Sequence, residues 1–204
     1  MMLFWLVAIS VYLVFLGWYY NWSGPIKPHE IDALVAQLSE SSGASHTDIN
    51  VVRQFLEEDD GKAFVMQNFV RFHSGDIKHP LTGELSSPRS VLMNYVRPFA
   101  MSLFKGGGHP VNQARICGGL IDSWGDAQAP AWQGTGMMRY RSRRQLIELA
   151  SDPRFSDIHV FKLAAIESTQ NYPVTLVMSV YLSPGVYVPL CLALLASLAQ
   201  NIFA

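Results

Sequence analysis

The two ends of the chain are apolar and the middle is polar, so the sequence divides into three parts. Every Lys, Arg, Asp and Glu lies between Lys27 and Glu167. The first stretch, MMLFWLVAISVYLVFLGWYY, is uncharged, and as a helix it would extend roughly 30 Å, the thickness of a bilayer's hydrocarbon core. This pattern predicts a transmembrane helix over residues 1–22. A cleaved signal peptide is the alternative, although the stretch has no basic beginning and no A-x-A cleavage pattern.

Aromatic residues gather where this helix would leave the bilayer. Trp18, Tyr19, Tyr20 and Trp22 lie close together at its carboxyl end. Amphipathic rings are typical of the headgroup boundary, where lipid meets water. The four residues are therefore predicted to lie at a membrane interface.

The other uncharged end, residues 168–204, is interrupted by three prolines. The tripeptide SPG at 183–185 indicates a turn, and the apolar stretch after it predicts a second transmembrane helix over residues 183–204. A helix buried inside the protein is the alternative, because a stretch of under about twenty residues fits both. Residues 174–182 fit either a fourth strand of the folded domain or an earlier start of the membrane helix.

Two spans would place the folded middle on one side of a membrane and both termini on the other. The basic residues closest to the spans are Lys27 and Lys162, too few for the positive-inside rule to orient the chain. Cys117 lies in the polar region and Cys191 in the apolar tail, so no disulfide within the domain indicates a redox compartment. The sequence predicts an integral membrane protein whose folded domain faces a side that stays open.

The polar middle changes from helical to strand periodicity along its length. Residues 23–60 carry two amphipathic helical patterns and are predicted to form a helical linker region. The order of the elements after it predicts an α+β domain of the ferredoxin-like βαββαβ type over residues 61–182. The expected elements are strand 63–72, helix 89–105, strands 111–121 and 131–141, helix 142–152 and, if it is a strand, 174–182.

The segment RYRSRRQLIELASDPRF, residues 139–155, holds five of the ten arginines. A serine followed three residues later by a glutamine forms a capping box at 142–145, so the arginines divide between a strand end and the first turn of a helix. A nucleic-acid groove needs basic residues gathered on one face and usually an excess of positive charge. This chain has 15 basic and 16 acidic side chains, so the sequence argues against a nucleic-acid partner.

Five short motifs follow one another through the middle of the chain. They are AFVMQNFVRF, Tyr95 within a helix, GGHPV at 107–111, WQGTGMMRYRSRRQLIELASDPRF and AAIEST at 164–169. In this order they resemble the domain-of-unknown-function family 1330, which belongs to the dimeric α/β-barrel superfamily. The resemblance covers about residues 47–170. Two departures from the family pattern are Arg141 in place of a proline and Lys162 as the one basic residue of a run that often contains histidine.

The resemblance implies a cavity shared with a partner subunit and a set of residues that would line it. The residues at family positions are Asn68, Arg71, Tyr95, Trp132, Arg139, Ser142 and Asp152, of which the first five would line or reach the cavity. An arginine beside an aromatic ring suits a carboxylate or a planar ligand. The alternative is that both arginines pair with acidic side chains at the rim of the sheet and that Trp132 belongs to the core.

The remaining chemistry-bearing residues form no recognisable motif. The six histidines make no HxH, HxxxH or HExxH pattern and no pair with a cysteine, so the sequence predicts no metal site. A haem ligand stays an alternative with no particular histidine as its candidate. Ser142 is assigned to a cap, and neither cysteine has a neighbouring base. The prediction is no cofactor and no catalytic residue.

Two functions of different class follow. The first is a membrane-anchored interaction domain, an accessory or structural subunit of a membrane protein assembly with no catalysis of its own. Its partners would be the lipid bilayer and either other membrane subunits or further copies of itself. The alternative is a small cofactor-independent enzyme of oxygenase or isomerase type, or a binder of a lipophilic or carboxylate-bearing small molecule. The first is favoured because no acid/base or nucleophile group is visible.

Overall fold

The computed structural model of this chain describes most of the 204 residues and divides them into two units. The first unit is residues 1–174 and the second is residues 175–204. The helices and strands named below all belong to the first unit. The described residues are 2–41, 44–125, 131–179, 190–191 and 194–195.

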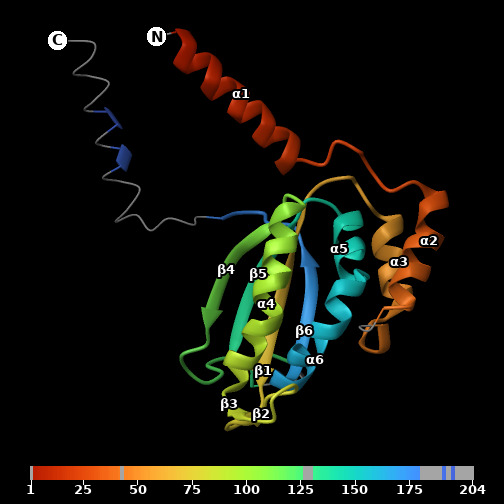
Figure 1. Cartoon of the computed structure of the whole chain (residues 1–204), viewed down its shortest axis with the longest axis vertical. Helices are drawn as coiled ribbons and strands as arrows, with labels where there is room; N and C mark the ends of the chain where they lie inside the picture. Colours follow the sequence, from red (N-terminus) through yellow and green to blue (C-terminus); the bar gives the residue numbers. More distant parts are fainter. Residues whose placement is uncertain (1, 42–43, 126–130, 180–189, 192–193, 196–204) are drawn as a thin grey trace. The chain divides into compact units, whose positions relative to one another are not determined.

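A four-stranded antiparallel sheet forms the centre of the first unit, with the strand order β4-β5-β1-β6 (Figure 1). Its strands are β1 (Phe64–Phe72), β4 (His109–Arg115), β5 (Gly134–Tyr140) and β6 (Ile166–Val174). A short separate ribbon pairs β2 (Ile77–Lys78) with β3 (Leu85–Ser86). The fold is a mixed α+β fold, and its strand order is consistent with the predicted ferredoxin-like pattern.

Helices connect the strands and cover one face of the sheet. These helices are α4 (Pro88–Lys105), α5 (Arg143–Ala150), η2 (Pro153–Phe155) and α6 (Ser156–Ala165). Phe64 of β1 and Tyr140 of β5 stack at 5.3 Å between ring centroids and share a buried cluster with Leu103 of α4. Strand side chains alternate between the two faces, so this cluster identifies the face that the helices cover.

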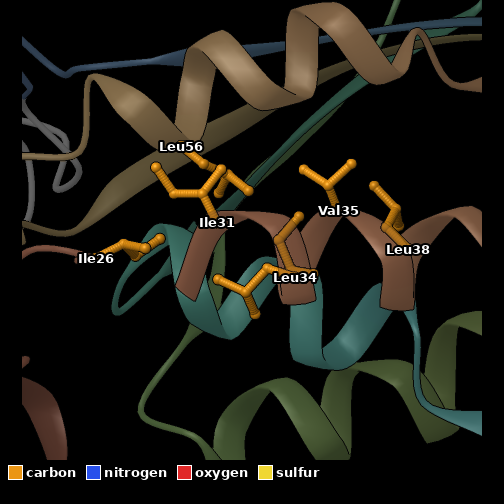
Figure 2. Packing of buried hydrophobic residues seen from close by; sticks show 7 residues of the cluster. Ile26, Ile31, Leu34, Val35, Leu38 and Leu56 are labelled. Atoms are coloured by element: carbon orange, nitrogen blue, oxygen red, sulfur yellow. The ribbon is translucent and has the colours of Figure 1, made fainter. Parts of the chain in front are cut away.

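Two N-terminal helices form a second apolar layer against α5. They are α2 (Pro28–Ser39) and α3 (Ile49–Glu57), with the short η1 (Ala44–His46) between them and α1 (Met2–Tyr19) before them. Ile31 and Val35 of α2 pack with Leu56 of α3 and with Ile147 of α5. Figure 2 shows the α2 side chains beside Leu56. Residues 23–60, predicted to be a helical linker region, thus contribute to a buried core.

The membrane prediction is wrong, and it needs correction. Within the described part of the chain, no helix combines the length and the apolar character that crossing a bilayer requires. The helix α1 has 18 residues, about 27 Å at 1.5 Å per residue, against roughly 30 Å of hydrocarbon core. Its last turn, moreover, contacts the folded domain. The predicted localisation, an integral membrane protein with two spans, is therefore overturned, and most of the predicted second span, 183–204, lies outside the described residues.

The last part of the domain also differs from the prediction. The fourth strand is β6 at Ile166–Val174, whereas the sequence left residues 174–182 open between a fourth strand and an earlier start of the apolar helix. A helix that was not expected, α6 at Ser156–Ala165, precedes this strand. The strand is hard to recognise in the sequence because six of its nine residues are polar or proline, as suits an edge strand.

Candidate functional site

The face of the sheet opposite the helices carries the candidate site and is called the outer face here. It is defined by Gln67, Phe69 and Arg71 of β1 together with the residues beside them on β5 and β6. Met137 and Tyr172 lie opposite Gln67 on the two neighbouring strands. These side chains are half-buried or exposed, in contrast to the buried rings under the helices.

Aromatic rings form the centre of the outer face. The ring of Phe69 lies 5.9 Å from that of Trp132 and 6.4 Å, edge to face, from that of Tyr172. The Thr169 hydroxyl donates to the Phe69 carbonyl oxygen over 2.8 Å and so ties β6 to β1 beside these rings. Edge-to-face and tilted pairs at such distances are favourable arrangements. The three rings are held in place by one another and by the strand pairing.

One end of the outer face carries a closed ion pair. Arg71 of β1 pairs with Glu167 of β6. Arg71 Nε is buried and has no hydrogen-bond partner among the described residues. The charge of the arginine is thus matched within the chain. This is the rim pairing that the sequence left open as an alternative to a ligand-binding arginine.

The other end of the outer face holds a buried arginine that makes no ion pair with a carboxylate of the described residues. Arg139 of β5 donates from Nη1 to the Gly107 carbonyl oxygen (2.8 Å) and from Nη2 to the Tyr19 carbonyl oxygen (3.1 Å). Its guanidinium lies 3.7 Å from the centroid of the Tyr19 ring. Burial lowers the pKa of Arg139 from its ordinary value. The planar group is covered by a ring and satisfied by carbonyl oxygens, a combination that suits arginine.

The carboxyl end of α1 is held in a socket on the folded domain. The socket consists of Phe104, Gly107, Arg139 and Arg141. Arg141 donates to the Trp18 carbonyl oxygen (3.3 Å), while Trp18 Nε1 donates to the Phe104 carbonyl oxygen (3.0 Å). The last carbonyl groups of a helix lack partners within it and carry partial negative charge, so two arginines are suitable donors there.

The glycine run at 106–108 makes room for this socket. Gly107 has φ +84°, and a Cβ on it would collide with the Trp18 carbonyl oxygen. The N–H groups of Gly107 and Gly108 donate to the carbonyl oxygens of Phe104 and Leu103, which is the Schellman arrangement. The run is therefore a helix end, as the sequence predicts, and also a surface of close backbone approach.

The remaining arginines of the segment 139–155 each have a protein partner. Arg143 donates to the Phe55 carbonyl oxygen and lies 3.4 Å from Asp59. Arg144 makes two bonds, of 2.8 and 3.2 Å, to the carboxylate of Glu30 in α2. That arginine lowers the pKa of Glu30 mainly through its side-chain hydrogen bond. The segment thus joins the N-terminal helices to the sheet.

The structure separates the five residues predicted to line a pocket. Arg71 and Trp132 lie at the outer face, and Arg139 lies at its far end beneath Tyr19. Asn68 lies on the helix-covered face, because strand side chains alternate between faces, and it donates to the carbonyl oxygens of Met66 and Gly136. Tyr95 lies on α4, stacked on Phe99. Asn68 and Tyr95 thus lie on the helix-covered side of the sheet, whereas Arg71, Trp132 and Arg139 lie on the outer side.

The predicted membrane-interface residues occupy different environments. Trp18 and Tyr19 are half-buried against the socket, whereas Tyr20 and Trp22 are exposed. Trp22 Nε1 donates back to the Leu16 carbonyl oxygen (3.0 Å). No signal in the sequence distinguishes the first pair from the second, because the partners of Trp18 lie 86 and 123 residues away.

Sequence reasoning missed two groups of residues. Tyr172 of the outer face lies on the unpredicted strand β6, and the pair His159 and Lys162 lies on the unpredicted helix α6. The helical spacing of Ile158, Phe161 and Ala165 was the available signal for α6. Across the described residues, no group of three or more His, Cys, Asp or Glu side chains is arranged to hold a metal ion.

Comparisons with known proteins identify a shared fold. No family model matches the chain, and no curated protein matches it. Two solved structures of the RPA0582 protein, a protein of unknown function from Rhodopseudomonas palustris, are similar. The methylated form has 21% identity and a TM-score of 0.54 over 65% of this chain and 93% of its own. The second has 20% identity and a TM-score of 0.52 over 65% and 96%. At these identities the likeness shows the fold alone.

Proposed function

We propose that this protein is a non-catalytic interaction domain that pairs with a second copy of itself through the outer face of its sheet, as an accessory or structural subunit of a protein assembly. The resemblance to domain-of-unknown-function family 1330 supports this proposal, because it implies a dimeric α/β barrel in which two sheets face each other. The observation that carries the proposal is the aromatic centre of the outer face, Phe69, Trp132 and Tyr172.

The apolar centre gives pairing a driving force. Tyr172 is 49% exposed, and Phe69 and Trp132 are half-buried. Aromatic residues and Met are enriched at protein interfaces, and apolar area removed from water contributes about 25 cal/mol per Å². Met137 lies on the same face opposite Gln67. Burial of this patch in an interface would remove its rings from water without breaking any contact within the chain.

The charges of the outer face favour a second copy as the partner. In a two-fold interface the same patch meets itself, so a patch with net charge repels its own copy. Here Arg71 is paired with Glu167, and Arg139 is covered by Tyr19. The residues between them, such as Gln67, Thr135 and Gln170, are neutral. Apart from the covered Arg139, the named residues of this face thus carry no unpaired charge, which is compatible with pairing to a second copy.

Sedimentation equilibrium of the full chain tests this function. We expect a species of twice the chain mass of 22.8 kDa. Tyr172→Glu should weaken the pairing by at least about tenfold, because two carboxylates would meet inside an apolar interface. The matched control is Leu163→Glu, which also alters a side chain that is 49% exposed but lies on α6.

Circular dichroism should show that both variants are folded. A monomeric parent chain contradicts the proposal. The proposal is also contradicted if Tyr172→Glu leaves the pairing unchanged, or if Leu163→Glu weakens the pairing as much as Tyr172→Glu does.

A further inference from the structure

The helix α6 places two basic side chains one turn apart beside α4. His159 and Lys162 are three positions apart in the sequence, so they lie on the same side of the helix. Phe161 and Ala165 are buried in the cluster that joins α6 to α4. Tyr95 of α4 is adjacent to both basic residues. This group, Tyr95, His159 and Lys162, is called the α4–α6 group below.

Lys162 is a half-buried amine without a counter-ion. Its Nζ lies 5.7 Å from the centroid of the Tyr95 ring. Within the described ranges, no carboxylate lies within ion-pair distance of it. Burial lowers the pKa of the Lys162 ammonium from its ordinary value. A protonated amine here therefore lacks both full hydration and a compensating negative charge.

His159 lies near the same ring. Its imidazole is 6.0 Å from the Tyr95 ring, and its Nδ1 is buried with no hydrogen-bond partner among the described residues. Burial is the largest cause that lowers the pKa of His159, followed by the charges of Lys162 and then of His46 in η1. The charged groups that act on the imidazole are therefore both basic.

Tyr95 supplies a third donor. Burial raises the pKa of Tyr95 to about 12, so its hydroxyl keeps its proton at neutral pH. The ring stacks on Phe99 at 5.5 Å between centroids, which fixes its position. In the described part of the chain no hydrogen bond from the hydroxyl is found. The group thus combines a phenol, an imidazole and an amine, and it contains no acceptor with negative charge.

We propose that the α4–α6 group binds a small carboxylate-bearing molecule, with Lys162 and His159 as its cationic donors and Tyr95 as a neutral one. A bound anion supplies the negative charge that these two desolvated bases lack. It would favour protonation of both bases and relieve the repulsion between them. The site is separate from the outer face, since the helices lie on the opposite side of the sheet, and it goes beyond the pairing function.

A carboxylate fits this group better than a phosphate. Desolvation of a charge is costly, and a carboxylate loses the hydration of one charge whereas inorganic phosphate near neutral pH loses that of one to two. The Tyr95 ring, beside both bases, adds an apolar surface for the organic part of the molecule. Benzoate, acetate and inorganic phosphate are therefore informative probes, and we expect the strongest binding for benzoate.

Titration of the full chain with each probe at fixed ionic strength, followed by the NMR signals of the imidazole protons, tests the site. We expect benzoate to shift the signals of one histidine and to bind more tightly at pH 6 than at pH 8.5, because protonation of the two bases favours the anion. Lys162→Met should weaken benzoate binding about tenfold or more, and Tyr95→Phe about threefold, from the usual strengths of charged and neutral hydrogen bonds.

Lys105→Met is the matched control, since it removes the same charge from an exposed position at the end of α4. If Lys105→Met weakens benzoate binding as much as Lys162→Met does, the binding is a general attraction between charges, and the proposal is overturned. Absence of benzoate binding by the folded parent chain, or phosphate binding stronger than benzoate binding, would also overturn it. Benzoate binding that is lost in Lys162→Met but kept in Lys105→Met supports the proposal. Circular dichroism of the Lys162→Met variant establishes that this variant is folded.

Discussion

The two faces of the sheet differ in what surrounds their aromatic rings. On the helix-covered face, Phe64 and Tyr140 are 7% and 4% exposed and pack under Leu103. On the outer face, the ring of Tyr172 is paired with Phe69 but stays 49% exposed. Rings of the same chemistry thus stabilise the fold on one side and stay accessible on the other. The difference indicates that the stability of the chain resides mainly in the helix-covered side, whereas the outer side leaves a ring accessible to solvent.

The largest loss in the free energy of unfolding should come from a substitution on the helix-covered face. Leu103→Ala removes a fully buried side chain from the cluster of Phe64 and Tyr140, and we expect a loss of about 3 kcal/mol in the free energy of unfolding. Tyr172→Ala on the outer face should cost under about 1 kcal/mol in the unpaired chain. Urea denaturation at low protein concentration measures both. Similar losses for the two variants would remove the distinction between the faces.

An intermediate loss in the free energy of unfolding is expected from a substitution in the socket of α1, at the end of the outer face. Arg139→Met leaves the carbonyl oxygens of Gly107 and Tyr19 without their donor, which should cost about 2 kcal/mol. It should also alter the fluorescence of Trp18, which lies in the same socket. Arg115→Met, at an exposed position at the end of β4, is the control. Equal effects in urea denaturation, or an unchanged fluorescence spectrum for Arg139→Met, would show that the socket does not hold α1.

The smallest expected effect is the pH dependence of the free energy of unfolding that comes from His159 of α6. The pKa of His159 is lowered by burial in the folded chain, so below about pH 6.5, the unfolded value, the unfolded chain binds more protons. The free energy of unfolding should therefore fall as the pH is lowered from about 7 to 5. His159→Gln should flatten this slope, and His29→Gln, an exposed position on α2, should not. A slope that both variants leave unchanged would contradict the assignment.

Periodicity was a good guide for the elements with one strongly apolar face. Strand 63–72 corresponds to β1 at Phe64–Phe72, and helix 89–105 corresponds to α4 at Pro88–Lys105. The sequence failed at the polar edge strand β6, because IESTQNYPV offers few apolar positions to show a period of two. The uncharged stretch that follows it is more hydrophobic, and hydropathy alone therefore pointed to residues 174–182 as the candidate for a fourth strand.

The candidate site was less predictable than the fold. The resemblance pointed to Arg71 and Arg139, but it could not distinguish an arginine that binds a ligand from one that has a partner within the chain. Arg71 is paired with Glu167, 96 residues away, and Arg139 with Tyr19, 120 residues away. Such pairings depend on how the strands are arranged in space. Composition and local spacing do not contain that information.

The glycine run at 106–108 has a consequence for the whole unit. A side-chain carbon would meet Gln145 of α5 at the first glycine, Trp18 of α1 at the second, and both Leu103 and the Arg139 backbone at the third. Three consecutive positions therefore serve as a common junction for four elements, and each contributes by having no side chain. A side chain at the second glycine would require α1 to move, and one at the third would require movement of Leu103 and of the β5 backbone, whereas the flexible end of Gln145 could turn away from the first.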